Sequence, residues 1–356
     1  MKIDPLRAEL AHLLKINASD RPWQMPFAAA LSSGLPLMVG AWFDHLEYGL
    51  VSSLGGLVFL YMPATILSHR MVMLMACAFG MTAAYTLGLS GHFVPALMVP
   101  MLIFVTIAAT MLSRFYGVGM PGGLFFVMTA SIAAYAPVDI LAVPLMVGLI
   151  SMGTLLACLI AFCYSLYILR RHPPKPAAPL PEPSFDAMVF EPAMIGVFVG
   201  IALAVAQGIG LEKAYWVPIS SLVVMQGVSL RAVWTKKLQR IFGTSVGLLL
   251  ALAVLHLPLD KWSVGAVMMV LAFIVETLIV RQYAFAAVFL TPMAILLAEA
   301  ASLGHVAPLT LIEARFLDIV LGSFIGLLGG LCLHWPRLRV PLSGWARRLT
   351  PARFDP

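Results

Sequence analysis

A succession of long apolar segments constrains this chain more than any other feature. The segments lie at approximately residues 24–43, 48–67, 71–89, 93–112, 115–136, 140–169, 192–210, 215–230, 238–257, 262–280, 283–303 and 313–334. A helix that crosses a bilayer needs about 20 apolar residues. Of the 356 residues only 11% are charged, and the mean hydropathy is +0.97. The sequence therefore predicts an all-α polytopic membrane protein with about twelve transmembrane helices.

A proline-rich stretch at residues 170–191 divides these segments into two sets of six. Prolines at this density favour an extended linker over a packed element. Residues of the same type recur 167 positions apart in the two sets: Arg114 and Arg281, Tyr116 and Tyr283, Tyr48 and Tyr215. Because six spans return the chain to its starting side, we expect two parallel six-helix repeats, residues 21–169 and 192–334, related by a pseudo-twofold axis along the membrane normal.

The basic residues predict how the chain is oriented. All but three of the 22 Lys and Arg residues (the exceptions are Lys213, Lys261 and Arg315) lie in the termini, the linker or the loops on one side. The positive-inside rule makes that side cytoplasmic, with both termini inside an inner (plasma) membrane. The net charge of +6 then favours anionic lipids as partners and does not indicate nucleic-acid binding. We expect residues 1–20 to form an amphipathic cytoplasmic segment and residues 335–356 a basic cytoplasmic tail.

The stretch from Tyr215 to Gly247 joins an aromatic entry, a basic segment and a second apolar run. YWVPISSLVVMQ at 215–226 is followed by LQRIFGTSVG at 238–247. Further along the chain stand RQYAF at 281–285, Thr291-Pro292, and Arg315-x-x-Asp318-x-x-x-Gly322-x-x-x-Gly326. Together these motifs resemble the fusaric acid resistance family of aromatic acid exporters. The resemblance implies a proton-coupled secondary transporter that exports small organic anions, with aromatic carboxylic acids as the cargo class. It implies no cofactor, and leaves a periplasmic adaptor subunit or a homo-oligomer open as further partners.

The predicted substrate pathway begins at a basic cytoplasmic mouth. Lys237, Arg240 and Arg281 lie at the cytoplasmic ends of their segments, where they would concentrate an anion. The alternative is that these cations only anchor helix ends by reaching for lipid phosphates. The other candidate pathway residues lie in or beside the same spans: Tyr215, Trp216, Gln226 and Tyr283. The pair Tyr215 and Trp216 also fits an interfacial aromatic belt, in which Trp262 would take part.

Ionisable residues inside the last three segments are candidates for proton coupling. Such charges are costly in lipid, and usually face a bundle interior or a water-filled path. Arg315 and Asp318 are one turn apart, Glu299 lies close to them in the predicted topology, and Glu276 lies five residues before Arg281. A buried acid beside a cation can carry a proton. The alternative is a structural ion pair.

Two glycine pairs predict close helix contacts. Gly243 and Gly247, and Gly322 and Gly326, each have the four-residue spacing that lets another helix approach.

Other classes of function receive less support. The sequence has neither a phosphate-binding Gly-x-x-x-x-Gly-Lys loop nor a His-Glu-x-x-His zinc motif, and its four cysteines lack metal-ligand spacing. We therefore predict that the chain is not an enzyme and holds no metal. A passive organic-anion channel and a non-transporting membrane scaffold subunit remain the alternatives to a transporter. The intramembrane acids separate these alternatives, because a channel does not need them.

Overall fold

The computed structural model describes residues 17–19, 21–177, 179–180, 184–211, 213–227, 229–299 and 308–349. Helices provide all the regular secondary structure of these ranges, which confirms the all-α prediction. Most of the predicted amphipathic segment, residues 1–16, lies outside the described residues, as does the chain beyond residue 349.

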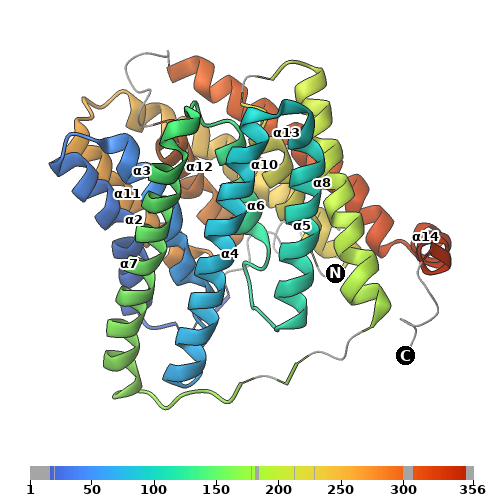
Figure 1. Ribbon diagram of the computed structural model, residues 1–356, viewed down its shortest axis with the longest axis horizontal. Coiled ribbons are helices and arrows are strands. Elements are labelled where there is room, and N and C mark those ends of the chain that lie inside the picture. Colours follow the sequence, from blue (N-terminus) through green and yellow to red (C-terminus); the bar gives the residue numbers. More distant parts are fainter. Residues whose placement is uncertain are drawn as a thin grey trace, which may run out of the picture.

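The described helices of the first half run up to the linker (Figure 1). They are α2 (Gln24–Trp42), α3 (Leu46–Gly56), η1 (Leu57–Tyr61), α4 (Leu67–Phe93), η2 (Pro95–Leu97), α5 (Met98–Phe115), α6 (Leu124–Ala134), η3 (Ile140–Ala142) and α7 (Val143–Leu169). The second half follows with η4 (Asp186–Phe190), α8 (Glu191–Gly208), α9 (Trp216–Met225), α10 (Leu230–Leu255), α11 (Lys261–Leu278), α12 (Tyr283–Glu299), α13 (Pro308–His334) and α14 (Pro336–Leu349).

Eight of the described helices are long and apolar enough to cross a membrane. Four others are apolar but shorter: α3 with η1, α6, α9 and α12. A helix of 10 residues, such as α9, rises only about 15 Å, half of the ~30 Å hydrocarbon core. The membrane character of the fold is therefore confirmed, whereas twelve full spans remain a prediction.

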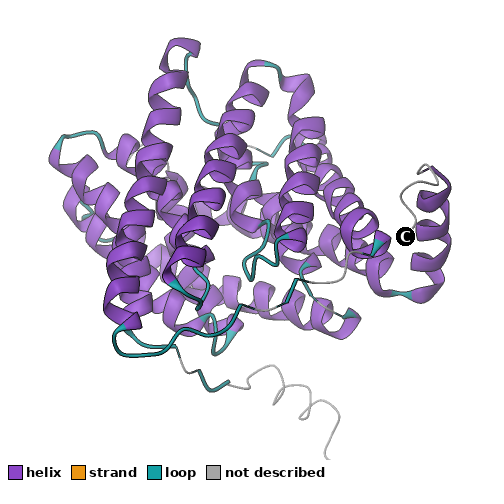
Figure 2. Ribbon diagram, turned by 60° about the horizontal axis from the view of Figure 1, so that its bottom comes forward, coloured by secondary structure: helices purple, strands orange, loops and turns teal. Residues whose placement is uncertain are grey.

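The short helices lie inside the bundle. Every residue of α9 is buried, as expected for a helix that is apolar on all sides. It packs against α8 and α13 and also meets α6 of the first half, while α12 meets α3. The halves are further joined where α5 packs on α8 and where α11 packs on α2. Figure 2 shows the bundle with the lower side of Figure 1 turned forward, and most of its helices lie side by side.

Glycines let two helix pairs in the second half pack closely. A Cβ atom added to Gly243 of α10 would lie 2.5 Å from the Ala284 carbonyl oxygen of α12, and one added to Gly247 would lie 2.6 Å from that of Val288. On α13, Gly326 approaches Ser221 of α9 in the same way, at 2.6 Å from its carbonyl oxygen. Larger residues at these positions would push the helices apart.

Two basic stretches, the loop expected between the segments 215–230 and 238–257 and the C-terminal tail, are helical. α10 begins at Leu230, so it includes the segment that contains Lys237 and Arg240. No glycine or proline lies between Ser229 and Gly243, and Leu, Lys, Gln and Arg are good helix formers. The C-terminal tail forms α14, which starts at a proline, a residue that a first helical turn accepts. The predicted linker also ends earlier than expected, because Glu191 is the first residue of α8.

Candidate functional site

Arg240 is a buried cation surrounded by neutral partners. Its side chain, on α10, is only 5% exposed. One guanidinium nitrogen, Nη1, donates to the Tyr283 hydroxyl of α12 (3.1 Å), and Nη2 donates to the Ser220 hydroxyl of α9 (3.1 Å). The third nitrogen, Nε, has no hydrogen-bond partner among the described residues, and no described carboxylate forms an ion pair with this guanidinium.

The packing of three helices explains this position. Arg240 lies three residues before Gly243, so both residues face α12, against which the glycines pack tightly. Tyr283 is the first residue of α12, and Ser220 lies in the middle of the buried helix α9. The burial of an uncompensated ion costs several kcal/mol, and two hydroxyl groups recover only part of this cost. The arrangement is therefore electrostatically suited to an anion.

A cavity of about 240 Å³ adjoins this arginine through Tyr283. Its lining residues come from α10, the α11–α12 connection and the segment before α2: Asn17, Thr235, Gln239, Ile279, Val280, Arg281, Gln282 and Tyr283. Arg281 itself is exposed, and its carbonyl accepts a hydrogen bond from the Asn17 amide (2.9 Å). Tyr283 thus accepts a hydrogen bond from the buried guanidinium and also lines this cavity.

The three cations of the predicted mouth do not share one environment. Arg240 is buried and is not an exposed helix anchor, whereas Arg281 lines the cavity from an exposed position. The Lys237 ammonium lies 4.9 Å from the Trp234 ring centroid and 5.9 Å from that of Phe324. Cation–π contacts therefore hold Lys237 on aromatic rings.

Glu276 pairs with a residue that the sequence did not single out. Its carboxylate accepts a hydrogen bond from Nη1 of Arg21 (3.2 Å), just before α2, and the same nitrogen donates to the Glu276 carbonyl (3.4 Å). The sequence distance of five residues predicts Arg281 as the nearby cation, and the structure corrects this prediction. The observed ion pair instead links the start of the first half to α11.

Asp318 and Arg315 on α13 are both buried, at 1% and 5% exposure. Neither carboxylate oxygen of Asp318 has a hydrogen-bond partner among the described residues, so Arg315 and Asp318 do not form a hydrogen-bonded ion pair with each other. The Arg315 guanidinium carbon instead lies 3.4 Å from the centroid of the Trp216 ring. Glu299 is the last residue of α12, and its side chain lies outside the described part of the chain.

The aromatic pair at the start of α9 is not an interfacial belt. Tyr215 and Trp216 are 6% and 4% exposed, and so face protein. The Tyr215 ring lies 5.6 Å from that of Tyr135, whose hydroxyl accepts a hydrogen bond from Gln207 (2.9 Å). The burial of α9 between α13 and the first half overrides the interfacial position that the sequence indicated. Trp262 differs, since it is 39% exposed.

Gln226 lies at the opposite end of α9 and connects the halves. Its side-chain amide donates to the Pro121 carbonyl (2.9 Å), in the loop before α6. The neighbouring Gly227 carbonyl accepts a hydrogen bond from His334 at the end of α13 (2.8 Å). Gln226 therefore bonds across the interface between the halves, away from the hydroxyl partners of Arg240.

Sequence reasoning missed Ser220, Arg21, Tyr135 and Gln207 as partners of the candidate residues. Ser220 gave a signal, because it is a polar residue inside an otherwise apolar segment. The other three gave none, since their roles depend on contacts between helices far apart in the chain.

The fold and this site describe a helical membrane protein that buries Arg240, a cation without a described carboxylate partner, in its second half. Residues 194–329 match the sequence profile of a family described as fusaric acid resistance protein-like, which confirms the family resemblance for this segment. The chain is also 35% identical over 142 residues to an uncharacterized membrane protein, YvaC, of Bacillus subtilis (strain 168). That match covers 40% of this chain and 22% of the length of YvaC. No solved structure matches the chain.

Proposed function

We propose that this chain transports small organic anions across a membrane. The observation that carries the proposal is the buried Arg240 guanidinium, which has two hydroxyl partners, a free Nε and no described counter-ion beside a cavity of about 240 Å³. Guanidinium is a permanent cation with a planar array of donors that suits a carboxylate. We expect aromatic carboxylic acids among the possible anions, because the motifs within residues 215–326 resemble those of aromatic acid exporters and residues 194–329 match a fusaric acid resistance protein-like profile.

The same proposal includes two parallel repeats with both termini in the cytoplasm of an inner-membrane protein. Helices six positions apart in the order pack in corresponding ways. α3 packs on α7 as α9 packs on α13, and α4 packs on α6 as α10 packs on α12. Between the halves, α5 packs on α8 and α11 on α2, as a pseudo-twofold axis requires. On this topology the cavity opens to the cytoplasm, which favours export.

Asp318 is the proposed proton carrier. A carboxylate that is 1% exposed and has no described hydrogen-bond donor is poorly stabilised as an anion. Proton binding would remove its charge, so a change in access to this group can couple protons to cargo. A passive anion channel would work without this acid.

The test is flux in proteoliposomes. Wild-type protein should move an aromatic carboxylate such as benzoate, but not the uncharged benzamide. Arg240→Gln should lower benzoate flux per folded molecule by about tenfold or more, equivalent to about 1.4 kcal/mol. Arg171→Gln, an exposed arginine of the linker, is the matched control and should leave flux unchanged. Equal flux in Arg240→Gln and wild-type protein would remove Arg240 from the pathway.

A further inference from the structure

A separate helix, α14, lies beyond the last span. α13 ends at His334, only Trp335 intervenes, and Pro336 begins α14. Figure 1 shows α14 at the edge of the bundle, seen almost end-on, and Figure 2 shows it outside the bundle from another direction. A helix that follows a membrane-spanning helix after one residue begins close to the membrane surface.

α14 combines basic charge with exposed apolar side chains. It contains four arginines (Arg337, Arg339, Arg347 and Arg348) and no acidic residue. Among its described side chains, Leu338 is 38% exposed and Val340 is 67% exposed, and Trp335 just before it is 42% exposed. Basic helices with exposed apolar residues lie in the interfacial region of bilayers.

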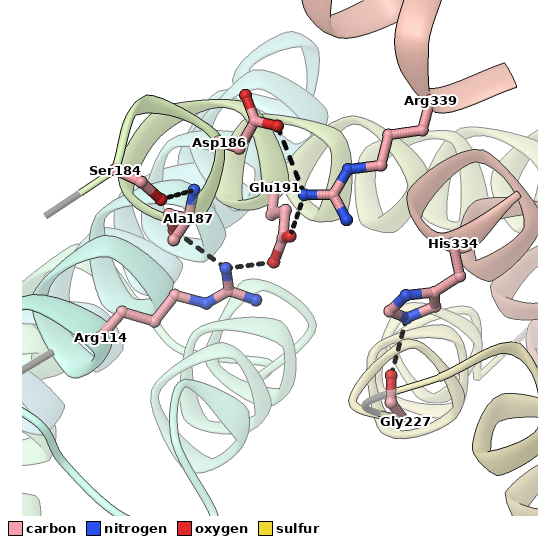
Figure 3. A network of polar contacts seen from close by, with 8 residues as sticks. All are labelled: Arg114, Ser184, Asp186, Ala187, Glu191, Gly227, His334 and Arg339. Atoms are coloured by element: carbon pink, nitrogen blue, oxygen red, sulfur yellow. Dashed lines mark hydrogen bonds and ion pairs between the residues drawn. The ribbon is translucent and has the colours of Figure 1, made fainter. Parts of the chain in front are cut away.

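An ion-pair network joins one of these arginines to the bundle (Figure 3). Nη2 of Arg339 donates to Glu191 (3.0 Å) and to Asp186 (3.4 Å). Glu191, the first residue of α8, also accepts from Arg114 of α5, which in turn donates to the Ala187 carbonyl (2.9 Å). Two cations and two anions balance within this network. Arg337 makes no ion pair with any described residue and is exposed.

We propose that α14 is an interfacial helix that binds the headgroups of anionic phospholipids through Arg337, and that Arg339 is the positioning residue that docks it on α8. The bilayer is the proposed partner because α14 continues directly from a spanning helix and therefore starts beside lipid. Its excess positive charge complements an anionic leaflet. The exposed side chains of Leu338 and Val340 can insert at the boundary between the headgroups and the acyl chains.

The test uses the full chain in nanodiscs. Gly344 is exposed and has no atom within 4 Å of an added Cβ, so Gly344→Cys can carry a fluorophore after the four native cysteines are replaced. In discs that contain phosphatidylglycerol, brominated acyl chains should quench this label at least twofold more than in pure phosphatidylcholine. Arg337→Gln should reduce the difference between the two lipids, whereas the control Arg171→Gln should preserve it.

Arg339→Gln separates positioning from lipid binding. It should lower quenching in both lipid mixtures, because it frees the helix from Glu191 without removal of Arg337. If the labelled protein with Arg337 and Arg339 intact shows no quenching in either lipid mixture, α14 lies in water and the proposal is overturned. Equal quenching in both mixtures would overturn the part that assigns anionic headgroups. Arg337 is exposed and Arg339 half-exposed, so a monodisperse elution profile suffices to confirm folding of these variants. Cys77 is buried, so the cysteine-free protein must show the same profile before it is labelled.

Discussion

The two halves of the molecule differ in buried charge at positions that lie 167 residues apart. Arg240 corresponds to Met73 on α4, and its partners Tyr283 and Ser220 correspond to Tyr116 and Ser53. On the last helix of each half, Arg315 and Asp318 correspond to Gly148 and Ser151. The first half is neutral at each position where the second half buries a charge.

The polar groups of the first half are also satisfied locally at these positions. The Ser53 hydroxyl donates to the Ser33 carbonyl (2.6 Å), and that of Ser151 donates to the Val147 carbonyl (2.7 Å). In the second half, Nε of Arg240 and both oxygens of Asp318 lack a described hydrogen-bond partner. Natural proteins rarely leave buried polar groups unpaired, and such groups mark functional sites more often than structural ones. Arg70 of the first half is also buried, but its guanidinium donates to the Thr65 carbonyl and the Ser165 hydroxyl. We therefore propose that the second half carries the transport chemistry.

The largest expected effect comes from the close contact that holds the charged half together. Gly322→Val would drive a side chain into the Val217 carbonyl and the Ser220 side chain of α9. We expect a loss of stability of roughly 3 kcal/mol, at the upper end for overpacking. Gly148→Val in the first half is the control, because a Cβ there meets no atom within 4 Å. Thermal unfolding in detergent measures both, and equal melting temperatures would contradict the packing argument.

Asp318→Asn tests whether the charge itself is used. The amide is nearly isosteric but cannot carry a proton under physiological conditions. It should abolish accumulation driven by a proton gradient in proteoliposomes and leave downhill exchange within about twofold of wild type. Ser151→Ala, at the corresponding position, should preserve both activities. If the Asp318→Asn variant still transports the anion uphill, this residue is excluded from coupling. If the variant folds but loses all flux, the residue belongs to the anion path.

The partners of Arg240 should affect transport more weakly than the arginine does. Tyr283→Phe and Ser220→Ala each remove one of the two hydrogen bonds to the guanidinium but keep its charge, so each should cost less than the tenfold loss expected for Arg240→Gln. We expect a raised KM for the anion and, since both bonds hold one guanidinium, non-additive effects in the double variant. Tyr116→Phe and Ser53→Ala should leave KM unchanged. Strict additivity would indicate that the two hydroxyl groups act independently.

The smallest effect concerns an exposed contact between the halves. Asp44 in the α2–α3 loop pairs with Lys261 at the start of α11. A hydrogen bond to Lys261 and its charge lower the pKa of Asp44 below its usual value of 3.8. The carboxylate therefore contributes stability above pH 3.8, and this contribution is lost as the pH falls through the lowered pKa. Asp44→Asn should be slightly less stable than wild type at pH 7 but indistinguishable at the acid end, as melting curves across pH would show.

The sequence by itself determined the helical membrane class and the approximate location of the helices. The predicted segments 192–210 and 313–334 became α8 (Glu191–Gly208) and α13 (Pro308–His334). Hydropathy and helix-breaking residues act over neighbouring positions, so this information is local. The resemblance to the fusaric acid resistance family could also be recognised from the sequence, because it rests on motifs within residues 194–329, the segment that matches the family's profile.

Only the tertiary structure decided which of the candidate residues are buried and with what they pair. Arg240 became a buried cation because α9, α10 and α12 converge on it, and Glu276 found Arg21 at a distance of 255 positions in the chain. Tyr215 and Trp216 lie in the interior and not at the membrane interface that the sequence also allowed, because α9 is enclosed on all sides. The burial and the partners of these residues depend on which helices pack together, and residues far apart in the sequence determine that packing.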